Sequence, residues 1–350
     1  MSVPPPPPPD AFDDLRQPPA APPAPLSRPG PEWARRPATA VARLRGRNLL
    51  LLSARDLLRA AADEKVLLVA LVAPVPAAIA GFARAARDAS APLLLSRPSG
   101  ADERGPEEAR DDAAFVEAAL HEADELRFSG PLALLKDPPR AGSVVPDRDR
   151  VYRELVAGFT QVAVTAQVND AAAARDAALT AAQVCQRDLG LELVPLGGSV
   201  AVAAEVALQL KARGALPSSI RLTGHEEEAR AVVLELGPVH ISSATETAPD
   251  QLLGQGVQLL VASGPFLRAL QRAAPRELID QLQSWADEKG ASLEQAAARH
   301  QRLLRELSAE AQQKLEALCC FEARELFLRA GAADTSARLA ARVALYVDEA

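Results

Sequence analysis

Thiols and histidines are scarce in this sequence. Its 350 residues include four histidines and three cysteines. Cys185, Cys319 and Cys320 do not have the paired spacing of zinc ligands, and two adjacent cysteines do not readily bridge each other. We therefore expect free thiols, as in a reducing cytoplasmic compartment, and no zinc site built from cysteine.

Long apolar runs and an excess of basic charge are also missing. No segment stays apolar for the roughly 18 residues that a membrane helix needs. The start, MSVPPPPPPD, lacks the basic and apolar regions of a signal peptide. The net charge is −7, so the basic footprint of a nucleic-acid-binding protein is absent. We expect neither a membrane nor a nucleic acid among its partners.

Large apolar side chains are few in residues 1–40, which are rich in proline and alanine. Such a segment cannot bury enough surface to offset the entropy of ordering, so we expect a disordered tail. The proline run 4–9 would form a short polyproline II rod, either an SH3-like ligand or part of a solvated tail. The folded unit is expected to span 41–350, with helices over about 276–350.

Within that unit, short apolar runs alternate with longer stretches of helical period. The runs are continuous rather than alternating, which is typical of a parallel sheet covered on both faces. Each predicted strand is followed by a predicted helix. The predicted strands cover 66–72, 92–96, 132–135, 161–165, 191–195, 219–222, 239–242 and 257–261.

Eight such units predict a (β/α)8, or TIM, barrel with a helical C-terminal extension. An open, doubly wound sheet is the alternative. No GxGxxG follows the first strand, which disfavours the dinucleotide-binding form of that alternative.

Five segments, in order and spacing, resemble the class II, metal-dependent ketose-bisphosphate aldolases, of the fructose- and tagatose-bisphosphate type. They include PLALLKDPP at 131–139 and ELVAGFTQVAV at 154–164. The others begin LSARDLLRAA at 52, PVHISSATET at 238 and LEALCCFEAR at 315. The resemblance implies an aldolase-like barrel, zinc as cofactor, and a phosphorylated sugar as ligand.

The metal ligands that the resemblance implies are largely absent. The catalytic aspartate falls on Asp137, but the metal-binding histidine beside it falls on Pro138, which cannot ligate zinc. The acidic residue that ends the family's fourth strand falls on Thr165. The acidic ligand that follows the fifth helix of the family falls near Glu192, which is out of register by a residue or two. The histidine and glycines after the seventh strand fall on Ser242, Ser243, Ala244, Thr245 and Glu246. We therefore predict that no metal or other cofactor is bound.

Lys136 and Asp137 are the candidate catalytic residues. Successive strand residues point to opposite faces, so only one of them can enter the barrel, and the family register selects Asp137. A lysine could form a Schiff base, although an adjacent carboxylate stabilises its ammonium form. The alternative is a strand end stopped by two prolines, with no chemistry.

Two loops are candidates for anion binding. Ser263 and Gly264 open a helix, with Arg268 one turn in, at the eighth loop where many barrels hold phosphate. Gly197 and Gly198 open another helix, but they also fit a tight turn with Ser199 as N-cap.

At the predicted carboxyl ends of the strands, Arg97, Lys136 and Asp137 are the charged side chains that we expect. This set is poor for class II chemistry, which needs a Lewis acid. We expect a non-catalytic pseudoenzyme, either an accessory protein or one that binds a phosphorylated sugar or another small anion. A lyase with a metal-independent mechanism is the alternative. Association with itself or with a partner subunit stays open.

Overall fold

The computed structural model describes most of the chain from residue 43 onward. The described residues are 43–99, 106–137, 148–166, 190–195, 200–214, 216–221, 230, 233–234, 236–237, 239–244, 246 and 248–348. The predicted tail over 1–40 and the candidate residues Gly197 and Gly198 lie outside them.

Eight parallel strands form a closed barrel. They are β2 (Leu68–Val72), β3 (Leu93–Arg97), β4 (Pro131–Lys136), β5 (Gln161–Ala166), β6 (Gly190–Pro195), β7 (Ser219–Arg221), β8 (His240–Ser243) and β9 (Val257–Ala262). Neighbours in sequence are paired, and β2 pairs with β9 to close the ring. The predicted TIM barrel is confirmed, and the open sheet is excluded. A further strand that the pattern did not predict, β1 (Leu50–Leu51), pairs with the start of β4.

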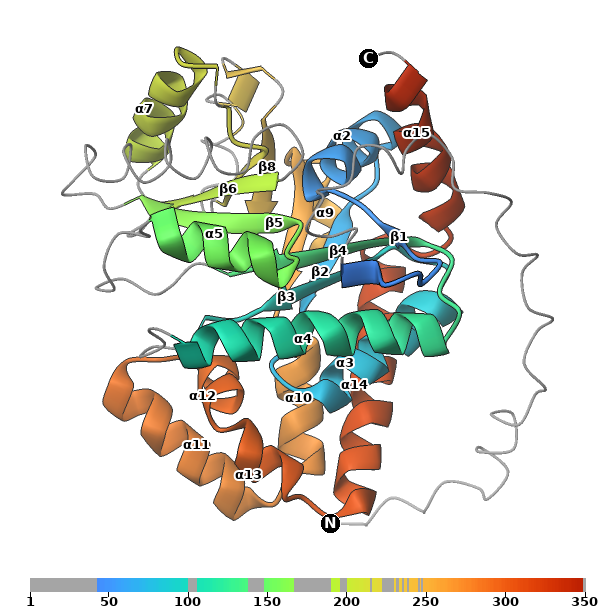
Figure 1. Cartoon of the computed structure of the whole chain (residues 1–350), viewed down its shortest axis with the longest axis vertical. Helices are drawn as coiled ribbons and strands as arrows, with labels where there is room; N and C mark the ends of the chain where they lie inside the picture. Colours follow the sequence, from blue (N-terminus) through green and yellow to red (C-terminus); the bar gives the residue numbers. More distant parts are fainter. Residues whose placement is uncertain are drawn as a thin grey trace, which may run out of the picture.

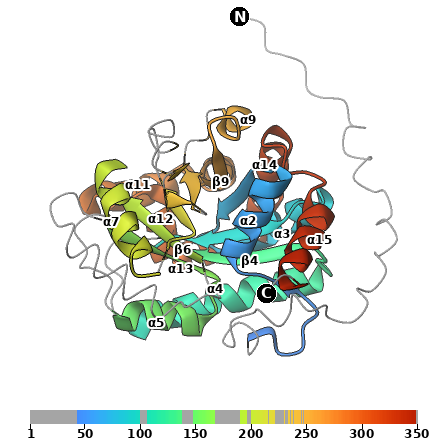
Figure 2. The same cartoon turned by 90° about the horizontal axis from the view of Figure 1, so that it is seen from above.

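Helices follow most strands and cover the outside of the ring (Figures 1 and 2). They are α3 (Pro76–Asp88), α4 (Pro106–Glu125), α5 (Arg148–Ala157), α7 (Val200–Lys211), α9 (Pro249–Leu252) and α10 (Gly264–Ala273). Helix α4 begins at Pro106, and proline is well tolerated in the first turn of a helix.

The strands have two apolar faces. Leu93, Leu95, Leu132 and Leu134 point outward and join the core beneath α3 and α4. Residues between them in sequence, such as Leu94, point inward and form a second core inside the barrel. This alternation explains why the runs are apolar throughout, and it sets which residues after a strand can enter the barrel.

Helix α2 (Ala54–Glu64) closes the barrel where the strands begin. Its Leu57 and Leu58 belong to the core inside the barrel. Ala54 N donates to Thr160 O, directly before β5. The opposite end, where the strands finish, is therefore the one available for a site, as in other barrels of this kind.

The C-terminal extension consists of helices that pack on the outside of the barrel and on α2. These are α11 (Arg276–Lys289), α12 (Leu293–Arg299), α13 (Gln301–Arg305), α14 (Ala309–Arg329) and α15 (Ser336–Asp348). Figure 1 shows α10 to α14 together below the strands, and α15 beside α2. At Gly81 of α3, an added Cβ would lie 2.4 Å from Glu316 O, so only glycine permits this approach of α14.

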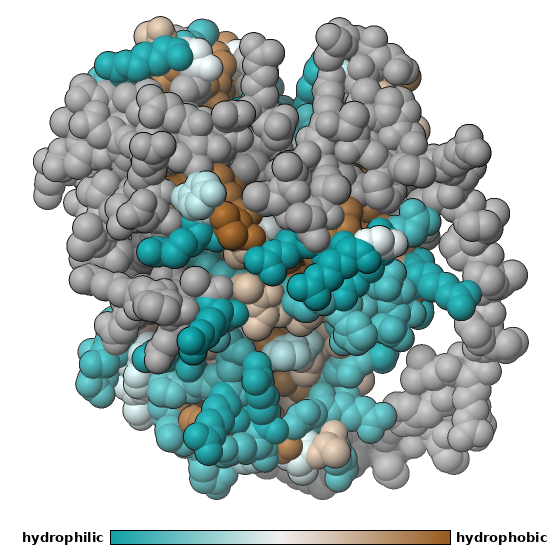
Figure 3. All heavy atoms as spheres, viewed as in Figure 1, coloured by the Kyte–Doolittle hydropathy of each residue, from teal (hydrophilic) through white to brown (hydrophobic). Residues whose placement is uncertain are grey.

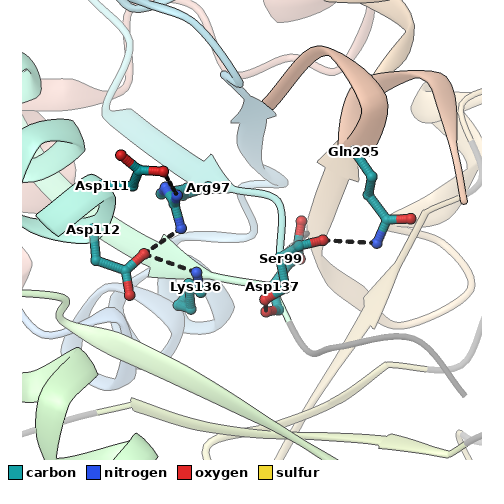
Figure 4. Close-up of polar contacts among 7 residues, drawn as sticks. All are labelled: Arg97, Ser99, Asp111, Asp112, Lys136, Asp137 and Gln295. Atoms are coloured by element: carbon teal, nitrogen blue, oxygen red, sulfur yellow. Dashed lines mark hydrogen bonds and ion pairs between the residues drawn. The ribbon is translucent and has the colours of Figure 1, made fainter. Parts of the chain in front are cut away.

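Helix α12 also orders the ends of two strands. Ser292 and Gln295 form a capping box at its start, and Gln295 Nε2 donates to Ser99 O at 2.9 Å. Ser99 Oγ donates in turn to Asp137 O at 2.5 Å (Figure 4). The extension therefore holds the loop after β3 against the end of β4.

The face of the molecule seen in Figure 3 is largely polar over its described lower half. In Figure 3, hydrophilic side chains cover most of the helices in the lower half of the view. Among the described residues, no helix has both the length and the apolar content needed to cross a bilayer.

Candidate functional site

Four polar side chains from four strands meet inside the barrel at the carboxyl ends of the strands. Arg221 Nη2 lies 2.8 Å from Asp137 Oδ1 and 2.6 Å from Glu192 Oε2. Ser242 Oγ donates to Glu192 Oε1. We call Asp137, Glu192, Arg221 and Ser242 the mouth cluster. It joins β4 to β7 across the ring, so it lies in the barrel and not in its wall.

The mouth cluster is buried unequally. The side chain of Glu192 is 1% exposed, whereas Arg221 is 13% and Asp137 is 15% exposed. Burial alone would lower the pKa of Arg221, but attraction to Glu192 and Asp137 outweighs it and raises that pKa above its usual value. The guanidinium is therefore permanently charged and held between two carboxylates.

Polar atoms also line the barrel interior below the cluster. Both amide atoms of Gln161, the hydroxyl of Ser219 and Nε of Arg221 are buried without a hydrogen-bond partner in the part that the structure describes. Gln161 reaches over β6, since a Cβ on Gly190 would lie 3.1 Å from its Oε1. The interior of β5, β6 and β7 therefore carries polar side chains, while that of β2 and β9 is apolar.

Lys136 belongs to a different cluster, on the outside of the barrel wall. Its Nζ lies 2.8 Å from Asp112 Oδ1 on α4, and Arg97 Nη1 donates to the same oxygen. Asp111 lies 3.8 Å from Arg97 (Figure 4). We call Arg97, Asp112 and Lys136 the wall cluster. Each of its side chains is at most 3% exposed.

The expected set of charged residues at the mouth was wrong for Arg97 and Lys136, although Asp137 does face the barrel interior. Arg97 and Lys136 are paired across β3 and β4 and face outward with Leu93, Leu95, Leu132 and Leu134. Asp137, one residue further on, faces inward. Glu192 was considered only as an out-of-register match to the family's acidic ligand, and Arg221 lies one residue before the predicted strand end that was searched for charged side chains. The alternation from Leu191 and Leu193, both outward, would have placed Glu192 inside.

The candidate anion site at the start of α10 already holds a carboxylate of the chain itself. Gly264 N donates to Glu246 Oε1 at 2.6 Å, and Arg268 Nη1 lies 3.6 Å from Glu246 Oε2. Arg268 Nε also lies 2.7 Å from Glu322 of α14. Ser263 is the residue before the helix, and its side chain makes no capping hydrogen bond. The loop after β8 carries Glu246, so two neighbouring loops meet here.

The described residues do not fit the zinc site that the resemblance implies. Among them, no group of three or more His, Cys, Asp and Glu side chains is placed to hold a metal ion. His121 lies on α4, His300 ends α12, and His240 starts β8, at the closed end of the barrel. A divalent ion between the mouth carboxylates would meet the Arg221 guanidinium. Pro138, His225 and the side chain of Thr165 lie outside the described part.

A small pocket lies outside the wall, between α3, α4 and α13. Pro74, Arg97, Phe115 and Arg305 are among its lining residues, and its volume is about 30 Å³. That space suits one or two water molecules. The pocket does not contact the mouth cluster, so it does not extend the candidate site.

Comparison with known proteins shows the fold alone. No family model matches the chain, and no curated protein matches it. Among solved structures, the YdjI aldolase from Escherichia coli K12 superposes with a TM-score of 0.58 at 11% identity, covering 82% of this chain and 99% of that chain. Fructose-bisphosphate aldolase from Campylobacter jejuni superposes with a TM-score of 0.53 at 10% identity, covering 81% of this chain and 96% of that chain. The chain therefore has an aldolase-like barrel.

Proposed function

We propose that this protein is a non-catalytic barrel of the aldolase type that binds a small ligand at the mouth cluster. Ligand binding could serve an accessory role, alone or with a partner subunit. The proposal concerns the end of the barrel where strands finish, because α2 fills the other end.

The arrangement of Arg221 carries the proposal. Class II cleavage requires a Lewis acid that stabilises the enediolate left after the carbon–carbon bond breaks. Here the two mouth carboxylates, Asp137 and Glu192, are both engaged by one guanidinium. An arginine that is neutralised by two carboxylates stabilises a developing negative charge poorly, because its own field is already compensated.

A cleavage assay on the purified full-length protein tests the lack of catalysis. We expect no cleavage of fructose or tagatose bisphosphate, with or without added zinc. Elemental analysis of protein purified without chelator should find less than about 0.1 zinc per chain, because a complete ligand set would retain the ion tightly. Zinc near one per chain with zinc-dependent cleavage would overturn the proposal.

Binding at the mouth is tested with variants of its partly exposed members. Asp137→Asn keeps the shape and removes one charge, and Asp124→Asn, at an exposed carboxylate of α4, is the matched control. Hydroxylated small molecules screened by thermal shift should stabilise the parent protein and the control alike. We expect Asp137→Asn to weaken that stabilisation. Equal stabilisation of all three proteins would place the ligand elsewhere.

A metal-independent carbon–carbon lyase is the second candidate. It is favoured by the partial exposure of the Asp137 carboxylate, which could accept a proton. If cleavage is found, Asp137→Ala should abolish it. A Schiff base on Lys136 is not expected, because its Nζ is buried against Asp112 on the outside of the barrel. Loss of activity in Lys136→Ala together with borohydride trapping of substrate would contradict that placement.

A further inference from the structure

We infer that the carboxylate of Glu246 occupies the position at the start of α10 where an external anion would otherwise bind. The ligand of the mouth is therefore a neutral, hydroxyl-bearing molecule that has no phosphate at this position. The inference deepens the proposed function, and its statement about the ligand rests on that function.

The contacts of Glu246 are those that a bound phosphate would make. One carboxylate oxygen accepts from the backbone N–H of Gly264 at 2.6 Å, and the other faces Arg268 at 3.6 Å. A backbone N–H at a helix start and an arginine are the usual donors to a phosphate oxygen. The side chain of Glu246 is 20% exposed, so it is a packed group and not a freely solvated one.

The approach is so close that a second anion cannot share the position. A Cβ added to Gly264 would lie 2.0 Å from Glu246 Oε2 and 2.8 Å from its Cδ. The carboxylate therefore rests directly on the backbone at the start of α10. A phosphate could bind only if Glu246 moved out.

The charge at this point also opposes a phosphate. Arg268 faces Glu322 at 2.7 Å in addition to Glu246, so two carboxylates share its guanidinium. Glu322 also accepts from Arg272 at 3.0 Å. A negative ligand would have to compete with carboxylates that are held in place by the fold.

An independent observation inside the barrel agrees. Arg221 is likewise held by two carboxylates, Glu192 and Asp137. Around the described part of the mouth, both arginines are thus compensated by the chain. Carboxylates that accept and guanidiniums that donate suit hydroxyl groups, which do both. This balance favours a neutral hydroxylated ligand over a phosphate ester.

The test is a titration of the full-length protein with inorganic phosphate, in which phosphorus NMR measures the bound phosphate. Four proteins are compared with the parent: Glu246→Gln, Glu246→Ala, the double variant Glu246→Ala/Arg268→Met, and Asp250→Asn. The last removes an exposed negative charge in the first turn of α9, close in sequence to Glu246, and serves as the control.

We expect the parent and Asp250→Asn to bind phosphate weakly or not at all. Glu246→Ala should bind it at least about tenfold more tightly, since one charge-assisted hydrogen bond supplies that difference. The double variant should lose the gain. Glu246→Gln keeps an acceptor for Gly264 N, and should show a smaller gain; it decides the question if Glu246→Ala does not fold.

Three results would overturn the inference. Phosphate binding by the parent as tight as by Glu246→Ala would show that the carboxylate excludes nothing. A folded Glu246→Ala without any gain would show that the start of α10 is not an anion site. A gain retained in the double variant would place the phosphate elsewhere. None of these depends on the cleavage assay, so the inference and the proposed function fail separately.

Discussion

Lys136 and Asp137 are adjacent in sequence, yet they belong to two charge clusters on opposite sides of the barrel wall. In the wall cluster, Asp112 of α4 is shared by Arg97 and Lys136. In the mouth cluster, Arg221 is shared by Glu192 and Asp137. One has two cations around a carboxylate, the other two carboxylates around a cation.

Burial separates the roles of the two clusters. The side chains of the wall cluster are at most 3% exposed and are covered by α4, so they join a helix to two strands. In the mouth cluster, the side chain of Asp137 is 15% exposed and that of Arg221 is 13% exposed. The comparison teaches that charge alone at a strand end does not mark a site. The face of the strand from which a charged side chain projects decides whether that side chain stabilises the barrel wall or contacts a ligand.

Removal of the shared carboxylate in the wall cluster should have the largest effect on stability. Asp112→Ala leaves the buried charges of Arg97 and Lys136 without the oxygen that both contact, which costs about 3–5 kcal/mol. Urea unfolding followed by circular dichroism measures the loss. Asp111→Asn is the control, because that carboxylate is 47% exposed and 3.8 Å from Arg97. Equal losses in both variants would contradict a closed structural cluster.

Loss of the shared guanidinium in the mouth cluster should cost less. Arg221→Met leaves Glu192 buried without its cation, while Asp137 keeps some contact with water. We expect a loss of about 2–4 kcal/mol, again by urea unfolding. Arg268→Met, at a side chain that is 42% exposed, should cost about 1 kcal/mol or less. A smaller loss for Arg221→Met than for Arg268→Met would reverse this ranking.

The closed end of the barrel provides a third point of comparison, through pH. Burial lowers the pKa of His240 to about 4 from 6.5, while Asp63 opposes the shift. Below pH 6.5 the His240 imidazole is protonated in the unfolded chain but stays neutral in the folded barrel. The free energy of unfolding therefore falls as the pH is lowered towards 4. Between pH 7 and pH 5 this amounts to about 2 kcal/mol.

His240→Gln should remove that part of the pH dependence, and chemical unfolding at the two pH values measures it. His121→Gln is the control, since His121 is exposed on α4. A pH dependence in His240→Gln equal to that of the parent would show that the ring is protonated as easily in the folded state as in the unfolded one.

Neutralisation of Asp137 should have the smallest effect on stability. Asp137→Asn keeps an acceptor for Arg221, which Glu192 still holds, so we expect a loss of about 1 kcal/mol or less by urea unfolding. A loss as large as that of Asp112→Ala would mean that Asp137 braces the fold as the wall cluster does, and the difference between the two clusters would disappear.

The barrel itself could be predicted from sequence. Apolar runs without alternation require a sheet that is covered on both faces, and their repetition with helical stretches favours a ring of parallel strands. The same two-residue period requires that Lys136 and Asp137 face opposite sides. Applied to Leu191, Glu192 and Leu193, it would also have shown Glu192 facing inward. These inferences need only neighbouring residues and the geometry of a strand.

Which groups meet was decided by the tertiary structure alone. Arg221 reaches Asp137 because ring closure places β7 across from β4, and the two residues are 84 positions apart. Glu246 meets Gly264 because the loop after β8 folds onto the start of α10, and Gln295 meets Ser99 over 196 positions. Such contacts depend on strand register and loop path, which local periodicity does not encode. For that reason the sequence indicated an anion site at α10, and only the fold showed that Glu246 fills it.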